Sequence, residues 1–107
     1  MAEFKNVRKV LGTSLSDVYT VPSATTAIVI GCQVTNVHTD GVDLDFLWTD
    51  ASAADAETYL ANNILVPARG AYEPIGGKLV LEAGDKLRGL SEVDTELEVT
   101  VSVLELS

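Results

Sequence analysis

Apolar and polar residues alternate almost without interruption over residues 96–107, the last twelve positions of the chain. The apolar set on one side of an extended chain is Leu97, Val99, Val101 and Val103, and the polar set on the other side is Glu96, Glu98, Thr100 and Ser102. A period of two with this many β-branched residues is typical of a strand with one buried face in an antiparallel sheet. The pattern therefore predicts a terminal β-strand.

The strongest internal strand is predicted over residues 25–36. Its alternation places two sets of residues on opposite faces: Ile28, Ile30, Cys32 and Val34 on one, and Ala27, Val29, Gly31, Gln33 and Thr35 on the other. Because neither face is strongly polar, we expect both to be at least partly covered.

An Asp40-Gly41 pair follows this segment, and Asp-Gly between two alternating runs is a strong hairpin signal. In the next run, Val42, Leu44, Phe46 and Trp48 are expected to point inward, and Asp43, Asp45 and Thr49 outward. The prediction is a hairpin that pairs residues 27–36 with residues 42–49.

Shorter extended runs are predicted over residues 4–11, 17–21, 58–66, 78–81 and 86–90, and residues 50–56 read as a loop that can hold one helical turn capped by Asp50. The total is seven to nine short strands at about ten-residue spacing. We predict an all-β, single-domain antiparallel β-sandwich, jelly-roll or immunoglobulin-like, covering residues 1–107. A barrel stays open, because the sequence does not give the strand order.

The chain is strongly acidic, with 16 Asp and Glu against 7 Lys and Arg and a net charge of −9. Nucleic-acid phosphates and anionic membrane surfaces repel such a chain, so we expect no direct nucleic-acid or membrane partner. The polar start of the sequence shows no secretory leader, and the single Cys32 offers no intrachain disulfide. We expect synthesis in a cytoplasm.

Basic residues gather at the start of the chain. Lys5, Arg8 and Lys9 fall within the first ten residues, and no Lys or Arg follows until Arg69. Two interpretations stay open for residues 1–10: an ordinary edge strand with a solvated basic face, or a docking arm for an acidic neighbour, including another copy of the chain.

No arrangement of residues indicates catalysis. His38 is the only histidine and no Gly-x-Ser-x-Gly elbow occurs. One Cys and one His cannot build a structural zinc site. The acidic stretch contains Asp40, Asp43, Asp45, Asp50, Asp55 and Glu57, but its spacing does not match a calcium loop. We expect a protein that is not an enzyme, with no metal or cofactor. The acidic stretch is read as a solvated face, and calcium binding by residues 40–57 stays open.

Residues 19–36, 66–67, 77–85 and 101–105 together resemble small virion structural proteins of tailed bacteriophages, particularly marine phages. The resemblance covers most of the chain from residue 17 onward and brings no catalytic residues. It implies a β-sandwich building block of the virion that binds other virion proteins, such as major capsid or neck and tail proteins, and that forms a homo-oligomer in the particle.

The leading hypothesis is a capsid decoration protein that grips the lattice through Lys5, Arg8 and Lys9. A neck or tail component is the nearest alternative. A different class is a module at a fibre or tail tip that binds carbohydrate or another host-surface ligand. For that class, Tyr59 and Tyr72 near the acidic stretch are the only aromatic material, and they also complete the set of expected interface residues.

Overall fold

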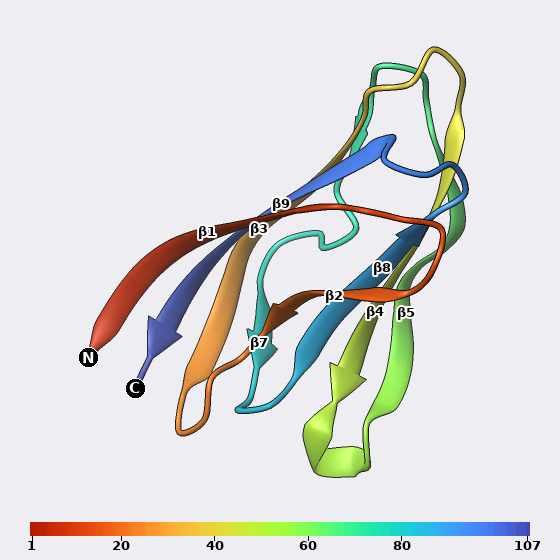
Figure 1. Ribbon diagram of the computed structural model, residues 1–107. Coiled ribbons are helices and arrows are strands. Elements are labelled where there is room, and N and C mark those ends of the chain that lie inside the picture. The colour runs from red at the N-terminus through yellow and green to blue at the C-terminus, as the bar shows by residue number, and fades with distance from the viewer.

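The computed structural model describes residues 1–107 as nine β-strands and one short 3₁₀ turn (Figure 1). Their bounds are β1 Ala2–Val10, β2 Ser16–Thr20, β3 Thr26–Asn36, β4 Val42–Asp50, η1 Ala51–Ala53, β5 Ala56–Val66, β6 Ala71–Tyr72, β7 Leu79–Leu81, β8 Lys86–Ser91 and β9 Leu97–Leu106. The only helical element has three residues, so no helix here has the length and apolar character needed to cross a bilayer.

The strands form two antiparallel sheets (Figure 1). The five-stranded sheet has the order β1-β9-β3-β6, with β7 also paired to β3, and the four-stranded sheet has the order β2-β8-β4-β5. Two separate sheets confirm the predicted all-β sandwich, and the open question between sandwich and barrel is resolved.

The core lies between the two sheets. From the five-stranded sheet, the apolar side of β9 points inward, and from the four-stranded sheet, Val42, Leu44 and Phe46 of β4 are fully buried. Trp48 continues this face and packs partly buried against the core. The inward sets predicted for both strands are therefore confirmed.

The predicted hairpin between residues 27–36 and 42–49 is wrong. β3 pairs with β9, β6 and β7, whereas β4 pairs with β5 and β8, so residues 37–41 cross from one sheet to the other. The fully buried Asn36 holds this crossing, because its amide donates to the backbone oxygens of Asp40 (2.9 Å) and Val66 (3.0 Å). The chain does turn at Asp40-Gly41, but the strands on either side of the turn, β3 and β4, belong to different sheets and do not pair.

The face predicted for residues 28–34 is also wrong in its first half. The register of β3 against β9 shifts between Val29 and Gly31, which makes a β-bulge at Ile30. Because an extra residue in one strand reverses the alternation, Ala27 and Val29 point inward before the bulge and Cys32 and Val34 after it. Ile30 is 44% exposed.

Candidate interaction surface

Strand β1 carries the three basic residues expected at an interface and forms one edge of the five-stranded sheet. Residues 2–10 pair with β9 in one continuous register, and no strand of the sheet pairs with the other side of β1. Alternation along β1 separates the three side chains. Lys5 and Lys9 lie on the face toward the second sheet, and Arg8 lies on the outer face.

Lys5 belongs to a polar cluster that joins the sheets. Its ammonium lies 3.0 Å from Oε1 of Glu105 on β9, and the Tyr19 hydroxyl on β2 donates a 2.5 Å hydrogen bond to Oε2. Tyr19 and Glu105 are buried.

The contacts of this cluster shift the pKa values of its members. The hydrogen bond from Tyr19 has the largest effect in lowering the pKa of Glu105, and the hydrogen bond from Lys5 has the next largest. Burial, followed by the bond to Glu105, raises the pKa of Tyr19, and Glu105 raises the pKa of Lys5. The cluster therefore holds Glu105 as a carboxylate.

The outer face of the five-stranded sheet exposes an apolar row. Phe4 of β1 lies opposite Leu104 of β9, Leu104 opposite Ile28 of β3, and Ile28 opposite Val80 of β7. Phe4 is 73% and Val80 58% exposed. This apolar row runs across four strands without a charge, and Leu106 and Ile30 extend the exposed apolar surface beside it.

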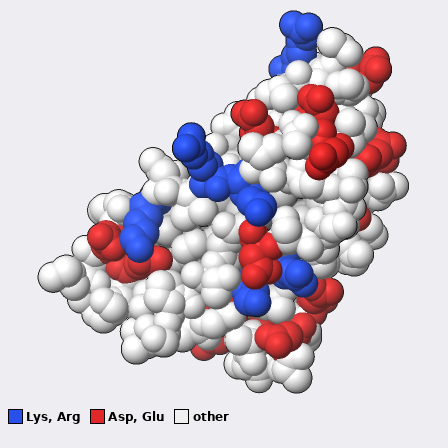
Figure 2. All heavy atoms as spheres, in the orientation of Figure 1, with Lys and Arg blue, Asp and Glu red and all other residues white.

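The outer face of the four-stranded sheet has a different character. Arg88 of β8 bridges Asp17 of β2 (2.8 Å) and Glu57 of β5 (3.2 Å), and Lys86 approaches Asp17 at 3.5 Å. These ion pairs lie on the face that also carries Leu47 of β4, which is 4% exposed. The space-filling view takes in β1 as well as the four-stranded sheet, and it shows basic groups between separate acidic ones over a largely uncharged surface (Figure 2).

The two tyrosines expected at an interface lie on different surfaces. Tyr59 of β5 is 54% exposed and pairs with Leu47, on the outer face of the four-stranded sheet. Tyr72 of β6 pairs with Val34 and packs partly buried against the core. The structure therefore does not bring the two rings into one aromatic platform.

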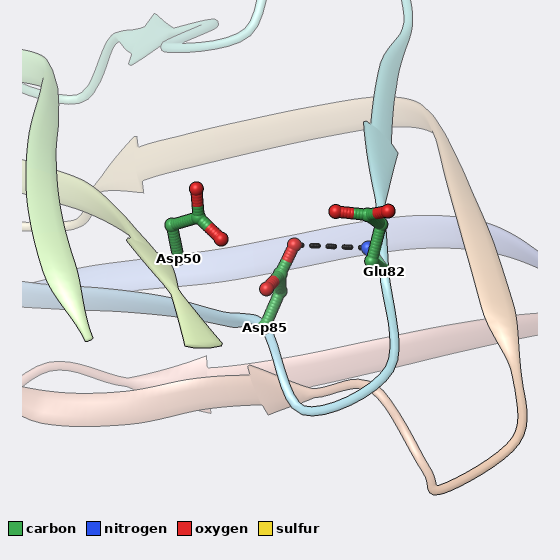
Figure 3. Close-up of side chains that lie close together, drawn as sticks. All are labelled: Asp50, Glu82 and Asp85. Carbon is green, nitrogen blue, oxygen red and sulfur yellow. Dashed lines mark hydrogen bonds between the residues drawn. The ribbon is translucent and has the colours of Figure 1, made fainter. Parts of the chain in front are cut away.

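Three carboxylates meet where the β4–η1 junction lies beside the β7–β8 turn (Figure 3). Asp85 is buried and already has hydrogen-bond donors: the backbone N–H groups of Ala51 and Glu82, both at 2.9 Å, and the Trp48 indole at 3.4 Å. Asp50 accepts from the backbone and hydroxyl of Ser52, as its predicted capping role requires. The bonds to Asp85 hold the β4–η1 junction against the β7–β8 turn, whereas the bonds of Asp50 stay within its own turn.

Cys32 lies in the core, where burial raises the pKa of its thiol to about 12, with a smaller effect from Glu73. A thiol in this state is a weak nucleophile, because the thiolate is the reactive form. Its position agrees with a small apolar role.

The sequence reasoning missed Glu105, Tyr19 and the apolar row. Glu105 did carry a signal, because it stands at an inward position of the terminal alternation where an apolar residue is expected. The row carried none, since Phe4, Ile28, Val80 and Leu104 become neighbours only through the strand order.

Comparisons with known proteins bear on the fold. No family model and no curated protein matches the sequence. Among solved structures, a subunit of the Bacillus endospore appendages, a family of disulfide-linked pili, aligns with a TM-score of 0.61 at 9% identity, over 100% of this chain and 87% of the other. A chain of the capsid of Helicobacter pylori bacteriophage KHP30 aligns with a TM-score of 0.57 at 9% identity, over 99% and 93%.

The Drosophila NLP core, described in terms of pentamer formation and histone binding, aligns with a TM-score of 0.52 at 11% identity, over 98% of this chain and 99% of the other. At such identities the likeness is one of fold. The sandwich is jelly-roll-like and has the architecture of subunits that build capsids and pili.

Proposed function

We propose that this chain is a non-enzymatic structural subunit of a tailed-phage particle, made in the host cytoplasm and bound on the capsid as a decoration protein. The observation that carries the proposal is the apolar row on the outer face of the five-stranded sheet. The fold of the chain is shared with a phage capsid chain over nearly the whole length of both, and this likeness supports a place in the virion.

The apolar row is a surface suited to protein contact. Exposed apolar residues that gather on one face, rather than scatter singly, commonly mark interaction sites. Burying Phe4 and Val80 against a partner removes apolar area from water at about 25 cal/mol per Å². The net charge of −9 opposes contact between acidic surfaces, and the apolar row carries no charge that would add to this repulsion.

The alternative is a neck or tail component of the particle. Such a component would use the same kind of surface and would differ only in the protein that it binds. The carbohydrate-binding hypothesis gains no support from the geometry. Its aromatic pair, Tyr59 and Tyr72, is divided between an outer face and the core.

Mass spectrometry of purified particles of the phage that encodes this chain tests the proposal. We expect the polypeptide in particles, with a copy number that follows capsid symmetry. A count that matches a ring of neck or tail subunits would move it there, and its absence from particles would contradict a virion role.

Point variants then test the docking face. Deleting residues 1–10 is unsuitable, because it would uncover β9. Val80→Glu places a charge in the apolar row, and we expect it to reduce incorporation into particles at least about tenfold. Leu65→Glu is the matched control, since Leu65 is 61% exposed on the other sheet. Equal incorporation of both variants would contradict docking through the row.

A further inference from the structure

The edge of β1 that faces away from β9 has a complete set of free backbone groups. Met1 and Ser107 exchange hydrogen bonds with each other, and the N–H of Leu11 donates to Leu97. Because hydrogen-bonded and non-bonded pairs alternate along an antiparallel ladder, the odd residues of β1 bond to β9. The N–H and C=O groups of the even residues, Ala2 to Val10, therefore point to the free edge.

The other sheet edges are short or irregular. β2 has five residues with a register shift between Asp17 and Tyr19, and β6 and β7 have two and three residues. β5 is long, but its register against β4 shifts twice between Leu44 and Leu47. Bulges and short strands are the usual protection against pairing between sheet edges. Only β1 presents nine residues in unbroken register.

We propose that two copies of the chain pair antiparallel through β1 and join their five-stranded sheets into one continuous sheet. A two-fold axis perpendicular to the sheet keeps both outer faces on the same side and fixes which registers are allowed. The register with full overlap is centred on Asn6. In it Ala2 lies opposite Val10, and Asn6 lies opposite Asn6 of the second copy.

In this register the charges of β1 are self-complementary. Glu3 lies opposite Lys9 of the second copy on the face toward the core side, and this pair occurs twice. On the outer face, Phe4 lies opposite Arg8 of the second copy, so a guanidinium can cover a ring that is 73% exposed. The two neighbouring registers that the two-fold axis allows are centred on Lys5 and on Val7. The first places Lys5 opposite Lys5 of the second copy, and the second places Lys5 opposite Lys9. Like charges therefore disfavour the neighbouring registers.

Lysines on an edge strand often prevent pairing, but both lysines of β1 have acidic partners in this dimer. Lys5 is already held by Glu105 and lies 3.6 Å from Glu3. Lys9 has no acidic partner within 4.0 Å in the single chain and meets Glu3 of the second copy. Because Glu3 and Lys9 of one copy match Lys9 and Glu3 of another, the partner strand at this edge is a second copy of β1.

The dimer does not depend on the proposed virion role. Joining two sheets at β1 places the two outer faces side by side, with Arg8 of each copy beside the Phe4 end of the other copy's apolar row. The test uses the free protein in solution. A chain that is monomeric in solution and present in particles would contradict the dimer alone. A chain that is dimeric in solution and absent from particles would contradict the virion role alone.

Sedimentation equilibrium of the full chain is the first measurement, and we expect a mass twice that of the 11.3 kDa chain. Asn6→Pro removes a free-edge N–H without touching the β9 ladder, and Asn6→Ala is its matched control. Both variants lose the bond from the Ser102 hydroxyl to Asn6. We expect Asn6→Pro to raise the dimer dissociation constant at least about tenfold relative to Asn6→Ala, with the fold checked by circular dichroism.

A charge exchange tests the register without altering the backbone. Glu3→Lys and Lys9→Glu each place like charges opposite each other, and we expect each to weaken the dimer about tenfold or more. The double variant Glu3→Lys/Lys9→Glu restores opposite charges and is expected to recover most of the affinity. A monomer up to about 1 mM, a dimer indifferent to Asn6→Pro, or a double variant weaker than both single variants would overturn the proposal.

Discussion

The phenolic hydroxyl of Tyr19 donates a 2.5 Å hydrogen bond to Oε2 of Glu105, and this bond joins the two sheets near one end of the sandwich. Both side chains point into the interior, and Lys5 supplies the opposite charge to the same carboxylate at 3.0 Å. A buried carboxylate is costly unless its oxygens are bonded. Here one oxygen is satisfied from each sheet, so the polar cluster fixes how the sheets meet.

Replacing Tyr19 with Phe removes this bond and keeps the ring. We expect Tyr19→Phe to lower the free energy of unfolding by about 2 kcal/mol, because a buried carboxylate oxygen loses its donor. Urea denaturation followed by fluorescence measures the change. Tyr59→Phe is the control, since Tyr59 is exposed and no hydrogen bond of its hydroxyl is present; a similar loss in both variants would contradict the role of the cluster.

The same cluster makes stability depend on pH at the acidic end. The folded-state pKa of Glu105 lies below its ordinary value of 4.5, so the unfolded chain binds the proton more readily. The contribution is therefore fully present above pH 4.5 and is lost as the pH falls through the folded-state pKa. We expect Glu105→Gln to flatten the fall in unfolding free energy below pH 4.5. A profile identical to that of the unaltered chain would contradict this origin.

At the alkaline end the sign reverses. The pKa of Tyr19 is raised above its ordinary value of 10.0 by burial and by the bond to Glu105, so its contribution is present below pH 10 and is lost as the pH rises above it. Unfolding free energy measured from pH 8 upward is expected to fall less steeply in Tyr19→Phe than in the unaltered chain. An unchanged slope would show that other groups cause the alkaline loss.

The crossing between the sheets depends on Asn36. Asn36→Ala leaves the backbone oxygens of Val66 and Asp40 without their donor, and it also removes the Oδ1 acceptor of the His38 N–H. We expect a loss of about 2–3 kcal/mol in unfolding free energy. Asn62→Ala, at an exposed position of β5, is the control and is expected to change stability by less than about 0.5 kcal/mol.

The alternation of apolar residues was sufficient to predict most strands and the sandwich, because burial of one face imposes a period of two on residues such as Val99 and Val101. It could not predict which strands pair. The Asp40-Gly41 signal is local, whereas the partners of β3 are set by β9, far along the chain. The bulge at Ile30 reversed a face that alternation had assigned. The clustering of Lys5, Arg8 and Lys9 predicts an edge strand or a docking segment, but Glu105 and the apolar row depend on contacts between distant strands.

Close packing between β4 and β8 gives a last test of the fold. A Cβ added at Gly89 would lie 3.0 Å from Cδ1 of Phe46, 3.2 Å from the backbone oxygen of Asp45 and 3.3 Å from Cδ1 of Leu11. Phe46 and Leu11 are fully buried, so neither side chain can move aside without disturbing the core. We expect Gly89→Ala to lower the unfolding free energy by about 1–3 kcal/mol. A Cβ at Gly76 meets nothing within 4 Å, and Gly76→Ala is expected to stay within about 0.5 kcal/mol of the unaltered chain in the same urea titration; equal stability of the two variants would show that β4 and β8 do not pack this closely.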